Sequence, residues 1–144
     1  MTETREDRIL HAGKLLKELE DMKASIRSES IRSLLSETRR AIEELRDAQY
    51  LFDSGEKELI RLYERYLPYL LDILKQYQAL EVSGNYEAIL KSRSQLEKTL
   101  AQMNETIKTV TKILPQDEID EANARAKAEE LRRLLEEQRN SVIK

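Results

Sequence analysis

The sequence predicts an all-α protein, an elongated up-and-down bundle of four to five long helices that forms a single domain over residues 1–144. Charged residues make up 37% of the chain and aromatic residues only 5%, a balance typical of long amphipathic helices. Three glycines and two prolines provide few turns. Apolar residues recur in steps of three and four, and no alternating β-branched run indicates a strand.

The first helix is predicted over residues 3–25, with Thr2 or Thr4 as its N-terminal cap. Its apolar stripe contains Ile9, Ala12, Leu15, Leu16, Leu19, Met22 and Ile26. Three serines between residues 25 and 30, and a five-residue step from Ile26 to Ile31, indicate a helix boundary. Because no glycine or proline enforces that boundary, a continuous bent helix is the alternative.

The second helix is predicted over residues 29–51. Its seam alternates steps of four and three, as in a helical bundle, and consists of Ile31, Leu35, Thr38, Ile42, Leu45, Gln49 and Phe52. Gly55 permits the turn that follows. Asp53 and Glu56 resemble a capping box for the next helix.

The third helix, residues 55–81, has the widest apolar face and contains four of the six tyrosines. Its apolar side chains fill an arc of roughly 200°, more than a surface helix needs. We therefore expect this helix to lie centrally and to contact neighbours on two sides. Pro68 lies in its middle, at the centre of the polar arc. A kink at Pro68 is favoured over a break, because the apolar period continues across the proline without a phase shift.

Gly84 is expected to close the third helix, and Ser83 or Asn85 to cap the fourth, which is predicted over residues 86–114. Its stripe contains Tyr86, Ile89, Arg93, Leu96, Leu100, Met103, Ile107, Val110 and Leu114. Pro115 is expected to end it, and Asp117 to begin a fifth helix that reaches about residue 139. The apolar face of the fifth helix is weak, so we expect it to be mobile or covered by a partner.

Composition also excludes several function classes. The chain has no cysteine, so thiolate chemistry and disulfides are impossible. The net charge is −3, and the arginine pairs lie among acidic residues, which is unlike the basic face of a nucleic-acid binder. The N-terminus is charged, and no apolar run approaches the roughly 20 residues of a membrane span. We expect a cytoplasmic protein without a membrane span.

One segment carries a family resemblance. Tyr66-Leu67-Pro68 is followed by a leucine-rich stretch that ends in Tyr77-Gln78-Ala79-Leu80-Glu81, then by a glycine-containing turn and a long helix. This arrangement resembles the 5-bromo-4-chloroindolyl phosphate hydrolysis protein family, also called XpaC-like, from about Ile31 onward. The family name implies hydrolysis of a halogenated indolyl phosphate. The family is also associated with toxic-anion-resistance (TelA-like) proteins, which the resemblance implies as a partner class.

The residues themselves offer little support for an enzyme. Phosphate-monoester hydrolysis requires a metal pair, an activated nucleophile or a dense cradle of cations. The chain has one histidine, His11, and isolated glycines, so neither a catalytic set nor a metal or cofactor site is predicted. His11 follows Asp7 by one helical turn, and this spacing indicates either an imidazole oriented by a carboxylate or a simple exposed pair.

The candidate binding residues are Tyr63, Tyr66, Pro68, Tyr77 and Arg93. The tyrosines either line an aromatic pocket or serve as core residues with the hydroxyl at the rim. Arg93, a cation in an apolar seam, either binds an anion, pairs with a buried carboxylate, or extends its head group from the seam edge. Three hypotheses follow: an interaction or scaffold protein, which is favoured and which includes a possible homo-oligomer, a weak phosphate-monoester hydrolase, and a small-molecule or anion sensor.

Overall fold

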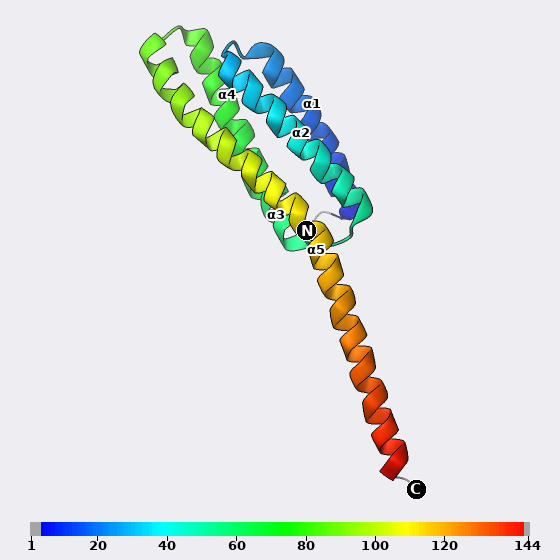
Figure 1. Ribbon diagram of the computed structural model, residues 1–144. Helices are drawn as coiled ribbons and strands as arrows, with labels where there is room; N and C mark the ends of the chain where they lie inside the picture. The colour runs from blue at the N-terminus through cyan, green and yellow to red at the C-terminus, as the bar shows by residue number, and fades with distance from the viewer. Residues whose placement is uncertain (1–3, 143–144) are drawn as a thin grey trace.

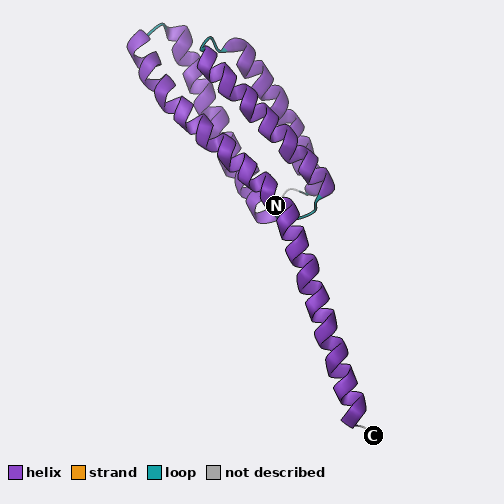
Figure 2. Ribbon diagram, in the orientation of Figure 1, coloured by secondary structure: helices purple, strands orange, loops and turns teal. Residues whose placement is uncertain are grey.

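The computed structural model describes residues 4–142, and every regular element in this range is helical (Figures 1 and 2). Helix α1 spans Arg5–Ser25 and α2 spans Glu29–Leu51. The third helical segment is continuous but has three parts: α3 (Glu56–Arg61), the π-helical turn η1 (Leu62–Tyr66) and α4 (Leu67–Ser83). Helix α5 spans Tyr86–Val142.

Four helices form the bundle in a closed ring of contacts. Helix α1 packs against α2, α2 against α5, α5 against α4, and α4 against α1. The connections are short, residues 26–28, 52–55 and 84–85, so successive helices run antiparallel, as Figure 1 shows. The prediction of an all-α protein is confirmed.

Local sequence signals place the first two helices where they were expected. The Thr4 side chain accepts a hydrogen bond from the Asp7 N–H, and the Thr4 backbone N–H donates one to the Asp7 carboxylate, which completes a capping box. Helix α1 ends at Ser25 and Ser28 caps α2, so the predicted boundary is confirmed and a continuous helix is wrong. Thr2 lies outside the described residues.

The turn before α3 differs from the prediction. Its N-terminal cap is Gly55, in the left-handed region at φ 67°, and no side chain caps this helix. The predicted capping box of Asp53 and Glu56 is therefore wrong. Both carboxylates turn toward α1 instead, where Asp53 lies 3.9 Å from Arg5 Nε and Glu56 lies 3.9 Å from Arg8 Nη1.

The two prolines lie inside helices. The chain remains helical through Pro68, so a break there is wrong. The π-helical turn η1 ends two residues before this proline, and the Leu67 N–H donates to the Leu62 carbonyl five residues back. This widened turn accommodates a residue that lacks an N–H, and a bend at Pro68 remains a prediction.

The predicted helix end at Pro115 is wrong, because α5 continues through it to Val142 and no separate helix begins at Asp117. A proline disfavours the helical conformation of the residue before it. Here that residue, Leu114, is fully buried, and its carbonyl oxygen accepts a hydrogen bond from the Ser54 hydroxyl. Tertiary contacts therefore hold Leu114 in the helix.

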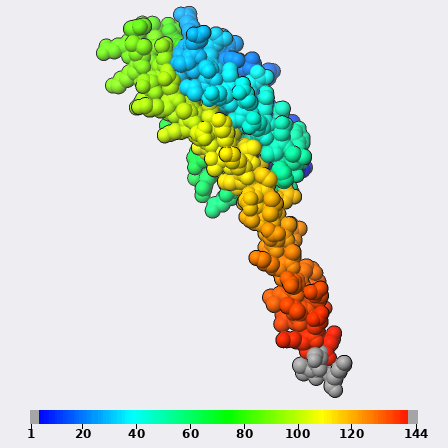
Figure 3. All heavy atoms as spheres, in the orientation of Figure 1, coloured from blue at the N-terminus to red at the C-terminus, as the bar shows by residue number. Residues whose placement is uncertain are grey.

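The core lies between the four helices and follows the predicted seams. The largest fully buried side chains are Leu15, Ile31, Leu35, Ile42, Leu45, Leu62, Tyr63, Leu67, Leu70, Leu74, Leu100 and Ile107. The core ends at Leu114. From Glu118 to Asn140 every side chain of α5 is exposed, and this part of the helix projects away from the bundle (Figures 1 and 3). We call residues 118–142 the stalk.

Candidate functional site

The five predicted site residues do not converge on one pocket. Tyr77 and Arg93 meet between α4 and α5, where Arg93 Nε donates a hydrogen bond of 3.1 Å to the Tyr77 hydroxyl. The pKa of Tyr77 is raised, chiefly by burial. The hydrogen bond from Arg93 lowers this pKa, and the nearby Glu81 raises it further. The pKa of Arg93 is also raised, chiefly because of its hydrogen bond to Tyr77. This pair fastens α5 to α4 at the edge of the seam.

Tyr63 belongs to the core. Its ring is fully buried, its hydroxyl donates to Gln49 Oε1 at 2.7 Å, and its ring centroid lies 5.3 Å from that of His11. His11 is half-buried against this ring. Asp7, the expected partner of His11, uses a carboxylate oxygen to accept from the Thr4 N–H at 3.2 Å.

Tyr66 and Pro68 lie on the outer face of the third helical segment, and the Tyr66 side chain is 40% exposed. Pro68 lines an open surface groove of about 550 Å³ against α1, together with Asp7, Leu10, His11, Lys14, Leu15, Glu18 and Leu71. The groove has no cluster of convergent cations, and its rim contains both acidic and basic side chains.

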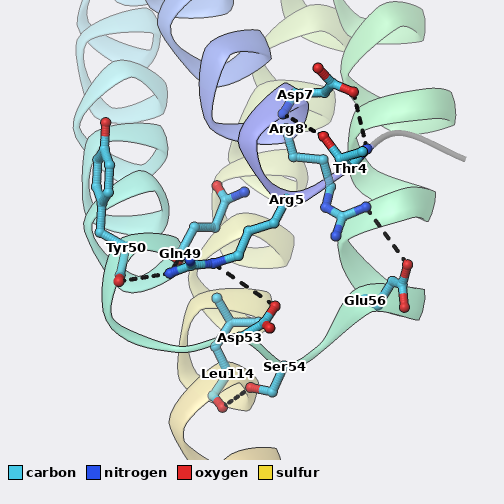
Figure 4. A network of polar contacts seen from close by, with 10 residues as sticks. All are labelled: Thr4, Arg5, Asp7, Arg8, Gln49, Tyr50, Asp53, Ser54, Glu56 and Leu114. Atoms are coloured by element: carbon cyan, nitrogen blue, oxygen red, sulfur yellow. Dashed lines mark hydrogen bonds and ion pairs between the residues drawn. The ribbon is translucent and has the colours of Figure 1, made fainter.

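A second hollow, at the end of the bundle where the stalk begins, was not predicted. It has a volume of about 310 Å³ and is lined by Thr4, Arg5, Arg8, Gln49, Phe52, Asp53, Ser54, Glu56 and Leu59. Figure 4 shows these side chains, except Phe52 and Leu59, at the junction of the start of α1, the end of α2 and the turn before α3. We call it the basal cavity.

The basal cavity is held together by polar contacts. Arg5 Nη2 donates to the backbone carbonyls of Gln49 and Tyr50, each at 2.8 Å. These hydrogen bonds supply donors to carbonyl groups in the last turn of α2, which have no partner within the helix. The Arg8 side chain is only 5% exposed. The sequence contains only part of the signal for this cavity: Arg8 stands one turn before Ala12 on the buried face of α1, and Gln49 occupies a seam position of α2.

Residues 4–142 contain no group of three or more His, Asp or Glu side chains placed to hold a metal ion. Within the same residues, no helix is long and apolar enough to cross a membrane.

In comparisons with known proteins, no family model, no curated protein and no solved structure matches this chain. The resemblance to the XpaC-like family therefore stays a prediction.

Proposed function

We propose that this chain is a non-enzymatic helical interaction protein, and that it binds an amphipathic helix of a protein partner along the stalk. One observation carries the proposal. Among the described residues the stalk packs against no other helix, since its side chains from Glu118 to Asn140 are all exposed, and these include Leu131 (59%), Leu134 (49%) and Leu135 (57%). An isolated helix gains most of its stability from packing an apolar face, so a partner that covers these leucines would stabilise it.

The leucines suit a second helix because of their spacing. Ala124, Ala128, Leu131 and Leu135 follow one another in steps of four, three and four, which places them on one face. Glu129 and Arg133 lie on the opposite face of the same turns, where they remain in water. The proposed contact is therefore a helix-on-helix seam bordered by charged residues.

The partner class comes from the family resemblance. We propose a cytoplasmic toxic-anion-resistance (TelA-like) protein as the first partner to test. Co-expression and sedimentation analysis should yield a complex with the wild-type chain. The double variant Leu131→Glu and Leu135→Glu should abolish it, because it places charge in the seam. A complex that forms equally well with this double variant contradicts the proposal.

The matched control is the double variant Glu129→Ala and Arg133→Ala, which changes two exposed residues on the opposite face and should leave the complex intact. Sedimentation of the purified chain alone over a range of concentrations identifies self-association. If the chain forms a dimer that the leucine variants dissociate, the partner helix is a second copy of the stalk.

Hydrolysis of a halogenated indolyl phosphate is the competing function. The test uses protein from a phosphatase-deficient host, followed across a fine chromatographic gradient. Activity that tracks the protein peak and is lost on Arg93→Ala would favour a hydrolase with a site beside α5. The proposal expects activity to separate from the protein, because the Arg93 Nε is already engaged by the Tyr77 hydroxyl.

A further inference from the structure

The sequence of the stalk indicates which charge its partner helix carries. From Ala124 onward the stalk has a seven-residue repeat, in which the seam residues at 124, 131 and 138 are each followed directly by an arginine. Seven residues are the period of a coiled coil, in which the positions beside the apolar seam set the choice of partner. The charges beside the seam of Ala124, Ala128, Leu131 and Leu135 therefore describe the partner.

The positions that border this seam are basic. Arg125, Arg132 and Arg139 follow one another in steps of seven along one edge, which we call the arginine edge. Lys127 and Leu134 lie along the other edge. Between residues 124 and 139, the glutamates are at positions 129, 130, 136 and 137, which face away from a partner helix. In this stretch, a partner therefore meets an apolar seam with cations and no carboxylates beside it.

The head groups of the arginine edge are accessible. The Arg125 side chain is 79% exposed, and its ion pair with Glu121, at 3.7 Å, lies within the helix. The Arg132 side chain is 69% exposed, and its ion pair with Glu129, at 3.2 Å, also lies within the helix. Because such exposed pairs are weak, both guanidinium groups can turn toward a carboxylate on a partner.

A second copy of the stalk fits this seam poorly. In a parallel pair with the leucines in register, Lys127 of each copy faces Arg132 of the other. In an antiparallel pair that aligns the same leucines, Arg132 faces Arg132, and Arg125 faces Arg139. Like charges that face each other across a contact oppose association. Both arrangements that match the leucines therefore bring cations together.

We propose that the stalk binds a different amphipathic helix, one that has glutamate or aspartate at the positions beside its own apolar seam. These carboxylates face the arginine edge on one side and Lys127 on the other. The inference rests on the proposed function, because it specifies the partner of the same seam. It also states that the chain alone does not dimerise through its stalk.

The test uses the full chain and two synthetic amphipathic peptides that have the same leucine seam. One peptide has glutamate at every position beside the seam, and the other has lysine there. Fluorescence anisotropy at low ionic strength should give the glutamate peptide a dissociation constant about tenfold or more below that of the lysine peptide, since several exposed charge pairs act together. This difference should shrink in high salt, which screens exposed charges.

Reversal of the arginine edge should reverse the preference. The triple variant Arg125→Glu, Arg132→Glu and Arg139→Glu should bind the lysine peptide more tightly than the glutamate peptide. The triple lysine variant at the same positions keeps the charge and should behave like the wild type. Arg133→Glu changes charge on the opposite face and should leave the preference unchanged. Circular dichroism checks that each variant remains helical.

The inference is overturned if the wild-type chain binds both peptides equally well through Leu131 and Leu135. It is also overturned if the purified chain forms a dimer that Leu131→Glu and Leu135→Glu dissociate. In either case the seam still binds a helix, so the proposed function survives. If neither peptide binds, the seam itself fails as a docking site, and the inference fails with it. The wild-type measurements decide between these results even if a charge variant does not fold.

Discussion

At the scale of single residues, two glycines with positive φ angles can be compared directly. Gly55 has φ 67° and Gly84 has φ 75°. A Cβ added at Gly84 meets open space, whereas one added at Gly55 collides with the side chain of Leu114. Leu114 is fully buried, so its side chain can move away only by displacing its neighbours in the core.

Gly55→Ala should therefore lower the free energy of unfolding by about 2–4 kcal/mol, since backbone strain and overpacking add. Gly84→Ala, the control, should cost only about 1–2 kcal/mol from strain alone. Urea denaturation of both variants measures the difference. Equal losses would mean that the contact with Leu114 does not restrict residue 55.

A buried polar pair joins α2 to α5. The Thr38 hydroxyl bonds Asn104 Oδ1, and Asn104 Nδ2 donates to the Leu34 carbonyl at 3.2 Å. Both side chains are almost fully buried. Thr38→Val keeps the shape but leaves Asn104 Oδ1 without its donor, so it should cost about 1–3 kcal/mol.

Adding Asn104→Leu to Thr38→Val should restore most of that loss, because it removes the unsatisfied oxygen as well. A double-mutant cycle of denaturation free energies measures the coupling. If the two losses simply add, the pair contributes nothing as a pair, and the buried polar contact has no special part in aligning α2 with α5.

Asp7 gives a pH dependence whose sign is defined. The Thr4 hydroxyl and the Thr4 backbone N–H hydrogen-bond its carboxylate and lower its pKa. A carboxyl with a lowered pKa stabilises the fold above its ordinary pKa near 4, and this stability is lost as the pH falls through the lower value. Thr4→Val should raise the Asp7 pKa toward the ordinary range, measured by carboxyl-carbon resonance. An unchanged pKa would show that the hydroxyl does not act on it.

At the scale of helices, the effect of a proline was the feature that the sequence did not predict. Periodicity predicted the bounds of α2 as the structure has them, because its seam repeats regularly and serines and Gly55 flank it. The same reasoning ended a helix at Pro115, where α5 continues. What keeps Leu114 helical is its contact with Ser54, sixty residues earlier in the chain, and a local pattern does not contain such information.

Pro115→Ala should strengthen α5 locally, because alanine restores an N–H that can donate to the Thr111 carbonyl. An interior proline costs about 3 kcal/mol, so amide hydrogen exchange around residues 111–119 should slow markedly. Gln116→Ala improves helix propensity without adding a donor and serves as the control. Equal slowing in both variants would assign the effect to propensity alone.

The basal cavity could not be predicted from the sequence either, because it also depends on contacts between residues far apart in the chain. Arg8 and Gln49 are polar residues at buried positions, which is a readable anomaly in each helix taken separately. Only the packing of the start of α1 on the end of α2 places them around one hollow. The predicted tyrosines illustrate the converse, since their helical spacing was correct but directed Tyr63 and Tyr77 into the core and Tyr66 outward.

At the scale of the whole molecule, the bundle and the stalk should behave as separate units. Side chains from Glu118 to Asn140 are exposed, so they add little to the stability of the core. A chain shortened after residue 117 should unfold within a few degrees of the full-length midpoint, measured by circular dichroism at 222 nm. A large drop in the midpoint would mean that the stalk folds back on the bundle.

The continuity of α5 through Pro115 also has a mechanical consequence. The 25 residues of the stalk extend it by about 37 Å at 1.5 Å per residue. A rotation of about 10° where α5 leaves the bundle would then sweep the far tip through roughly 6 Å. The turn that contains Gly55 and Ser54 touches α5 at Leu114, close to this fulcrum. Small rearrangements there would be amplified into large displacements of whatever the tip holds.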